Sequence, residues 1–270
     1  MIDQVREAAN FLIDRGFNDP EVGIILGTGL GALTDEIAIE KELVYSNIPH
    51  FPIATVEFHK GKLIYGMLGG KKVVAMQGRF HYYEGHSMAQ VVFPVRVMHE
   101  LGIKKLIISN AAGCMNLDWK KGELMLADDH INLQPESPLR GHEAAAFGQI
   151  FTDMSRPYDL EMNKLLKKIA QENEIQLHEG IYVSVAGPNL ETRAEYRYLR
   201  MIGADVVGMS TVPEVIAANQ LGLPVSAISV LTDECDPDNL KPINIEEIIA
   251  IAKDTEKDLI ILMKKLMQLL

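Results

Sequence analysis

Residues 22–32, VGIILGTGLGA, are the stretch that decides the fold, because a short apolar run leads directly into a glycine-rich turn. An uninterrupted apolar run of this length indicates a strand that is buried on both faces, as in parallel sheets. We predict further strands where similar runs recur, at 72–76, 106–109, 181–186, 205–209 and 225–231.

Segments with apolar residues at helical spacing separate these runs. The first helix is expected at residues 3–15, with Gly16 at its C-terminal cap, and others at 88–101, 160–173, 192–202, 213–221 and 245–270. Strands that alternate with helices predict an α/β fold around a mostly parallel or mixed sheet. No linker-like composition divides the chain, so we expect one domain over residues 1–270.

Charge and composition exclude several classes of partner. The chain carries 26 Lys and Arg against 37 Asp and Glu, a net charge of −11, which disfavours nucleic acid and anionic membrane surfaces. No apolar stretch is long enough to span a membrane, and no secretion signal is recognisable at Met1. Cys114 and Cys235 lack the spacing of a zinc site or a disulfide framework, so we expect a reducing cytoplasm.

Two irregular stretches, 46–61 and 134–157, are too long to be simple connections. Such loops are usually functional or disordered. The second contains Phe147 and Phe151, whose apolar rings would gain little in a solvated loop. We expect this loop to cover a pocket or a neighbouring subunit.

The glycine-rich turn at 27–32 allows backbone N–H groups to converge on an anion. It also fits a dinucleotide-binding pattern, but no acidic residue ends a strand about 20 residues further on to hold a ribose. A purely structural turn remains the third interpretation. The segment 77–86, QGRFHYYEGH, adds an arginine and two histidines, and predicts a basic pocket for phosphate or, alternatively, a solvated loop.

Four further segments follow or precede predicted elements. The small residues of 109–113 indicate a tight turn or, alternatively, a place where a flat ligand approaches the backbone closely. The carboxylate in 187–192 lies where a helix cap is expected, and recognition of a base is the alternative. In 207–214 a strand leads into a helix with Ser210 or Thr211 as the N-cap, which is also a position for an anion. The carboxylates of 231–236 have no histidine nearby, so we expect no metal there.

Five motifs in this order, GTGLGAL, GRFHYYEGH, NAAG, GPNLETRAEY and VGMSTVPEV, resemble those of the trimeric, low-molecular-mass purine nucleoside phosphorylases, which are related to the methylthioadenosine phosphorylases. The resemblance implies a three-layer phosphorylase-type fold with a central mixed, partly barrel-like sheet flanked by helices. It implies a homotrimer with sites near the subunit interfaces, and a cytoplasmic enzyme of purine salvage. Inorganic phosphate would be a co-substrate, with no metal or organic cofactor.

The resemblance also assigns roles to individual residues. It implies catalytic roles for His81, Glu191 and Asp233. It places phosphate among Thr28, His59, Arg79, His81, Ala111 and Ser210. It places ribose against Tyr83 and Met209, with Phe151 from a neighbouring subunit, and the base among Ala112, Gly113, Leu190, Glu191, Val207 and Asp233.

Substrate choice depends on Glu191 and on two departures from the family. Glu191 can accept the N1–H of a 6-oxopurine, which adenine lacks, so inosine and guanosine are expected substrates. Asp233 replaces the usual asparagine and would have to be protonated to donate, or would accept from the 6-amino group of adenine. Ile245 replaces a histidine expected at the 5′ hydroxyl. Adenosine or methylthioadenosine phosphorolysis and non-catalytic nucleoside binding are the alternatives.

Overall fold

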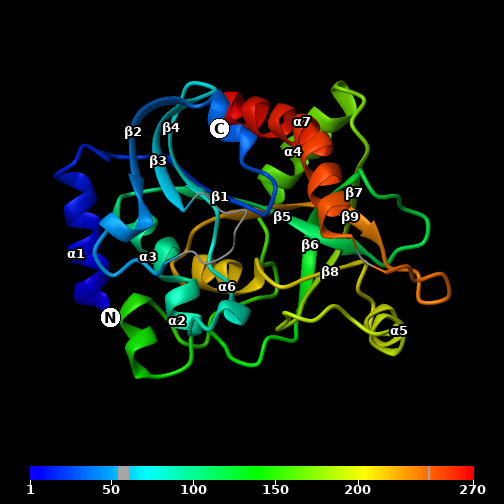
Figure 1. Ribbon diagram of the computed structural model, residues 1–270. Coiled ribbons are helices and arrows are strands. Elements are labelled where there is room, and N and C mark those ends of the chain that lie inside the picture. Colours follow the sequence, from blue (N-terminus) through cyan, green and yellow to red (C-terminus); the bar gives the residue numbers. More distant parts are fainter. Residues whose placement is uncertain (54–60, 243) are drawn as a thin grey trace.

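The computed structural model describes residues 1–53, 61–242 and 244–270, and its centre is one nine-stranded sheet (Figure 1). The strands are β1 (Val22–Leu26), β2 (Ala38–Val44), β3 (Lys62–Leu68), β4 (Lys71–Gln77), β5 (Lys105–Cys114), β6 (Leu124–Asn132), β7 (Leu177–Ser184), β8 (Val206–Gly208) and β9 (Val225–Glu234). The helices are α1 (Ile2–Ile13), α2 (Met88–Val91), α3 (Phe93–Glu100), α4 (Leu160–Glu172), α5 (Arg193–Met201), α6 (Val212–Gln220) and α7 (Ile245–Leu269).

The sheet is mixed and closes on itself at one end. Its strand order is β2-β3-β4-β1-β5-β8-β7-β6-β9, and β9 pairs with β5 as well as with β6. The pairs β1–β4, β1–β5, β5–β9, β6–β7 and β7–β8 are parallel, whereas β2–β3, β3–β4, β5–β8 and β6–β9 are antiparallel. The ring through β5, β8, β7, β6 and β9 confirms the expected mixed, partly barrel-like sheet.

Helices cover both faces of this sheet, and the central strand β1 is buried along its whole length (Figure 1). On one face, α1, α3 and α6 bury Leu12, Val95 and Val215 against β1 and β5. On the other, α4 and α7 bury Leu166 and Leu262. Burial on both faces explains why β1 is an unbroken apolar run, and the expected α/β architecture with flanking helices is confirmed.

The six strands predicted from apolar runs are all present, and three others escaped the pattern. In β2 most residues are exposed, so it has no apolar run to detect. In β6 the apolar half, Leu124–Ala127, is followed by the polar Asp128–Asn132, which breaks the pattern. In the third, β3, Gly66 interrupts the apolar run, and the strand begins directly after the irregular stretch 46–61.

Two local predictions were wrong. The helix expected at 88–101 is divided at Val92, because Pro94 lies in the first turn of α3, where its missing N–H is tolerated. The small residues of 109–113 form no tight turn; β5 continues through them to Cys114, and their backbone pairs with β9. In the part of the chain that the structure describes, no helix is both long and apolar enough to cross a membrane.

Candidate active site

A cavity of about 400 Å³ lies where β1, β4, β5, β8 and β9 end. Sites of this size and position are typical for small-molecule ligands in α/β proteins. It is lined by these residues proposed from the sequence: Thr28, Arg79, His81, Tyr83, Ala111, Ala112, Gly113, Leu190, Glu191, Val207, Met209, Ser210 and Asp233. The folded chain therefore brings together side chains that are as far apart in the sequence as Thr28 and Asp233.

Two predicted site residues are not among the described residues that line this cavity. His59 lies outside the described residues. Phe151 is 95% exposed, whereas Phe147 from the same loop packs against the core and under the guanidinium of Arg96. The two phenylalanines of the 134–157 loop therefore have different environments, and the ring of Phe151 lies almost fully exposed on the surface of the chain.

The glycine turn after β1 lies tightly against β5. A Cβ atom added at Gly27 would lie 2.7 Å from Cα of Asn110 and 2.9 Å from the backbone oxygen of Ser109. Real Cβ atoms do not approach a backbone so closely, and only glycine allows this contact. The close packing places the backbone of the turn, with Thr28, at the wall of the cavity.

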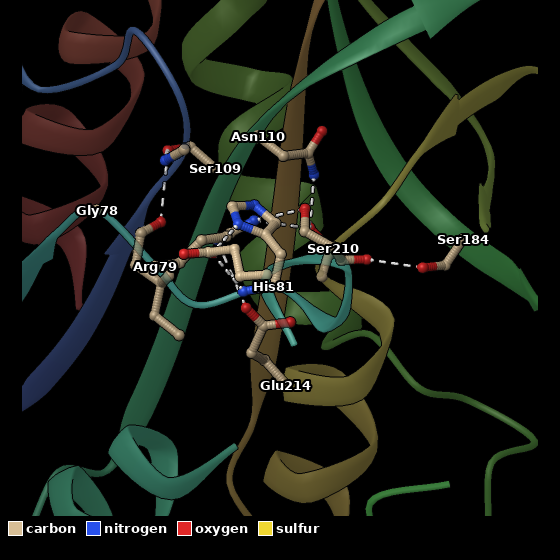
Figure 2. A network of polar contacts seen from close by, with 12 residues as sticks. Gly78, Arg79, His81, Ser109, Asn110, Ser184, Ser210 and Glu214 are labelled. Atoms are coloured by element: carbon tan, nitrogen blue, oxygen red, sulfur yellow. Dashed lines mark hydrogen bonds and ion pairs between the residues drawn. The ribbon is translucent and has the colours of Figure 1, made fainter. Parts of the chain in front are cut away.

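Arg79 supplies a buried cation at one end of the cavity (Figure 2). Its Nη1 donates to Oγ of Ser210 at 2.8 Å and to Oγ1 of Thr211 at 3.1 Å. Its Nε lies 3.5 Å from Oε1 of Glu214, and both of these side chains are almost completely buried. A buried guanidinium needs such partners, and its rigid fork suits phosphate.

His81 lies beside this arginine and is held by Glu84. Both the backbone N–H and Nδ1 of His81 lie 2.8 Å from Oε1 of Glu84, and the imidazole stacks on Tyr83 with 4.7 Å between ring centroids. Burial lowers the pKa of His81, and the hydrogen bond from Glu84 opposes that shift only in part. The carboxylate accepts from Nδ1 and so fixes it as the protonated nitrogen, which leaves Nε2 unprotonated in the neutral ring.

Two carboxylates, Glu191 and Asp233, line the other end of the cavity. Burial raises the pKa of Glu191, and the nearby charge of Asp233 adds to that effect. The hydroxyl of Thr232 lies 2.8 Å from Oδ1 of Asp233, and the thiol of Cys235 lies 3.2 Å from its Oδ2. The cavity is therefore polarised, with a cation at one end and carboxylates at the other.

Between these ends the cavity has aromatic and apolar walls. Burial, together with the charge of Glu84, raises the pKa of Tyr83 to about 12, so its hydroxyl stays protonated. Ile245 and Ile248, from the start of α7, add aliphatic side chains. A ligand that fits would have an apolar or neutral middle and polar groups at both ends.

Sequence reasoning did not assign roles to Asn110, Tyr196, Thr211 or Thr232. Asn110, Tyr196 and Thr232 line the cavity, and Thr211 is bonded to Arg79 behind its wall. Three of the four are direct neighbours of assigned residues, and Tyr196 follows Glu191 by five positions. Closeness in the sequence to assigned residues was therefore the only sign that they belong to the site. Among the described residues, no cluster of three or more His, Cys, Asp or Glu side chains could hold a metal ion.

Comparisons with known proteins give a consistent result. A family model described as "Phosphorylase superfamily" matches residues 21–268. "Purine nucleoside phosphorylase 1" of Bacillus subtilis is 45% identical over 264 residues, covering 98% of this chain and 97% of that protein. "Purine nucleoside phosphorylase" of Mus musculus is 43% identical, covering 96% of this chain and 93% of that protein.

Solved structures from Schistosoma mansoni have the same fold. Purine nucleoside phosphorylase isoform 2, in complex with cytosine and ribose-1-phosphate, superposes with a TM-score of 0.94 at 40% identity, covering 98% of this chain and 96% of that one. A purine nucleoside phosphorylase in complex with adenosine gives a TM-score of 0.93 at 40% identity, covering 99% and 97%.

Proposed function

The chain belongs to the phosphorylase superfamily, and its relatives across nearly its whole length are purine nucleoside phosphorylases. We propose that it cleaves purine nucleosides with inorganic phosphate and prefers inosine and guanosine. The products are the free purine and ribose 1-phosphate or deoxyribose 1-phosphate. The observation that carries this proposal is the polarity of the cavity, in which the buried Arg79 faces one end and Glu191 with Asp233 the other.

The proposal assigns phosphate to the cationic end. Arg79, Ser210, Thr28, His81 and the backbone N–H of Ala111 would bind its oxygens, together with His59. Arg79 is already oriented by Glu214 and Ser210, so little reorganisation is needed when the anion arrives. An anionic ligand also needs this local cation, because the protein as a whole carries a net charge of −11.

Bond exchange at the anomeric carbon follows from this placement. As the C1′–N9 bond breaks, its electron pair moves onto the purine and positive charge develops on the ribose. A phosphate oxygen then bonds to C1′ from the opposite face. Holding phosphate at the cationic end supplies proximity, and the ribose would lie between, against Tyr83 and Met209.

The base would lie at the carboxylate end, with Glu191 deciding the preference. Glu191 would accept from N1–H of hypoxanthine or guanine and from the 2-amino group of guanine. Adenine offers no N1 proton, and missing hydrogen bonds in a buried site discriminate strongly. In this arrangement Asp233 would lie at N7, where a donated proton would neutralise the departing purine. Ala112, Gly113, Leu190 and Val207 would contact the flat faces of the base.

A second candidate, phosphorolysis of adenosine or methylthioadenosine, is favoured by the surroundings of Asp233. The Thr232 hydroxyl and the Cys235 thiol both point at its carboxylate, and such donors stabilise the ionised form that would accept from a 6-amino group. The aliphatic Ile245 and Ile248 would suit a 5′-deoxy or alkylthio substituent. A non-catalytic nucleoside-binding protein remains the third alternative.

The proposal includes a homotrimer without metal or organic cofactor, working in the cytoplasm in purine salvage. Support for the assembly comes from Phe151, which is 95% exposed although its ring is apolar. A neighbouring subunit that receives this ring would cover it and complete the ribose side of its own cavity. No partner nucleic acid or membrane is proposed.

The test is cleavage of inosine, guanosine, adenosine and methylthioadenosine by the purified protein, with and without phosphate. Phosphate-dependent release of hypoxanthine and guanine would support the proposal, and turnover confined to adenosine or methylthioadenosine would support the second candidate. No turnover of any of the four would leave a binding protein. Arg79→Ala should then lower phosphate-dependent turnover by orders of magnitude in an enzyme, whereas a binding protein would keep its base affinity.

Asp233→Asn separates the two substrate classes. An asparagine donates through its amide whatever the pH, so the variant should favour 6-oxopurines more strongly than the wild-type protein does. The ratio of kcat/KM for inosine to that for adenosine measures the preference. An unchanged ratio would contradict the role given to Asp233.

A further inference from the structure

The backbone of Thr211 has an unusual conformation. Its φ is +69° and its ψ is −54°, and the N–H of Val212 donates to the backbone oxygen of Ser210 at 2.8 Å. These values describe a γ-turn with a positive φ, which is rare and strained, and especially so for a β-branched residue. Strain of this kind persists where the surroundings enforce it, and it occurs often at functional sites.

Helix capping does not explain the residue. Thr211 is the N-cap of α6, but its side chain makes no capping hydrogen bond. The side chain is completely buried and turns away from the helix toward Arg79 and Asn110. The strained turn therefore directs the Thr211 hydroxyl to Arg79 and Asn110, and not to the backbone N–H groups that a capping threonine usually contacts.

Counting hydrogen bonds fixes the direction of the Thr211 proton. Its Oγ1 accepts from Nη1 of Arg79 at 3.1 Å and from Nδ2 of Asn110 at 2.9 Å. A hydroxyl has two acceptor sites and one proton, so both sites are then used. The remaining contact, with Oγ of Ser210 at 3.2 Å, must be a donation from Thr211.

The same count applied to Ser210 gives a consequence for the ligand. Its Oγ accepts from Arg79 at 2.8 Å and from Thr211, which uses both acceptor sites. The proton of Ser210 is left for a group in the cavity that Ser210 lines. The backbone of Ser210 is held as well, since Oγ of Ser184 donates to its carbonyl at 3.0 Å (Figure 2).

We propose that Thr211 is a positioning residue for phosphate, which orients Arg79 and makes the Ser210 hydroxyl an obligatory donor to the anion. This rests on the proposed function in assigning phosphate to that end of the cavity. Without the Thr211 hydroxyl, the Ser210 proton could point away from the cavity. The lone pairs of Ser210 Oγ would then face a phosphate oxygen and repel it. Arg79 and Asn110 would each lose an acceptor.

The test compares Thr211→Val with Thr211→Ser. Valine keeps the β-branched shape and removes the hydroxyl, whereas serine keeps the hydroxyl. Binding of inorganic phosphate is measured by calorimetry, and KM is measured separately for phosphate and for inosine. The Thr211→Val variant should bind phosphate about tenfold more weakly or worse, and Thr211→Ser should stay within about threefold of the wild type. The KM for inosine at saturating phosphate should change by less than about threefold in both.

Thr211→Gly keeps the proposal testable if the valine variant does not fold. Glycine adopts a positive φ without strain, so this variant should fold and should still bind phosphate weakly because it lacks the hydroxyl. Wild-type phosphate affinity in Thr211→Gly or Thr211→Val, or equal losses in the valine and serine variants, would overturn the proposal. Phosphate binding with the expected ratios, in a protein that cleaves no nucleoside, would overturn the proposed function and still support the role of Thr211.

Discussion

Oε1 of Glu214, in the first turn of α6, lies 3.5 Å from Nε of Arg79, and both side chains are almost completely excluded from water. A buried charge that loses its partner is strongly destabilising. Glu214→Gln should therefore lower the free energy of unfolding by about 3 kcal/mol in phosphate-free buffer. Added phosphate should recover part of this loss, because the anion then neutralises Arg79. Denaturant unfolding with and without phosphate measures both effects.

An exposed ion pair provides the control for this prediction. Asp254 and Lys257 lie 2.8 Å apart on α7, with side chains 82% and 75% exposed. Asp254→Asn should change the free energy of unfolding far less than Glu214→Gln does, with no dependence on phosphate, because water already solvates both charges. Equal losses in the two variants would contradict the importance of burial at Glu214.

Cys235 is predicted to influence recognition of the base and not of phosphate. Its thiol lies 3.2 Å from Oδ2 of Asp233, at the carboxylate end of the cavity. Cys235→Ala removes this donor, so KM for the preferred nucleoside should change roughly twofold to tenfold, the range expected for one hydrogen bond. The KM for phosphate should change by less than about twofold, since Arg79 and Ser210 are at the other end.

Cys114 is the matched control, because it is also a buried free cysteine. Its thiol donates to the backbone oxygen of Asn116 and, among the described residues, makes no hydrogen bond to Asp233. Cys114→Ala should leave KM for the nucleoside near the wild-type value. If both alanine variants raised this KM equally, a general loss of packing would explain the effect better than the contact to Asp233.

Much of the fold was predictable because burial on both faces is recorded in the sequence. The run Val22–Leu26 is apolar throughout because β1 is covered by helices on both sides, and the start of β9 is likewise buried and mostly apolar. Exposed β2 has no apolar run, and among the described residues β3 is its only strand partner. Strands were therefore predictable where burial makes the whole run apolar, and not in exposed β2 or in β3 and β6, where Gly66 and the polar second half interrupt the run.

The residues of the candidate site were predictable from its motifs, but the hydrogen bonds among them were not. Ser210 and Arg79 were singled out, yet nothing in the sequence states that Thr211 turns its hydroxyl toward Arg79. That contact depends on a backbone conformation that the sequence pattern would not suggest for threonine. The pairing of Asp233 with Thr232 and Cys235 similarly depends on the backbone at the end of β9.

The titration of His81 gives a prediction about pH. Burial lowers its pKa in the folded protein below the ordinary value of 6.5, despite the opposing hydrogen bond to Glu84. The unfolded chain then binds more protons between the folded pKa and 6.5, so this histidine's contribution to stability is present above 6.5 and is lost as the pH falls through that window. Titration of the His81 ring by NMR should give a midpoint below 6.5.

Glu84→Gln tests the cause of this shift. The carboxylate raises the pKa of His81 through a hydrogen bond and through its charge, so removing the charge should move the midpoint to still lower pH. His81→Gln identifies the resonance by its absence. A midpoint at or above 6.5 in the wild-type protein, or an upward movement in Glu84→Gln, would contradict the assignment of burial as the dominant cause.

The glycine turn after β1 allows a comparison between two positions in one loop. A Cβ at Gly27 would lie 2.7 Å from the Cα of Asn110, so Gly27→Ala must push β1 and β5 apart, at a cost of about 1–3 kcal/mol in unfolding free energy. Phosphate affinity should fall with it, because the displaced turn carries Thr28. At Gly31 the φ is −94° and the nearest atom to an added Cβ is Nε2 of Gln77 at 3.4 Å, an ordinary van der Waals distance, so Gly31→Ala should change stability by less than about 0.5 kcal/mol. Denaturant unfolding of the two variants measures the difference; similar values would mean that β1 and β5 can separate at little cost, and that close approach at Gly27 does not position the turn.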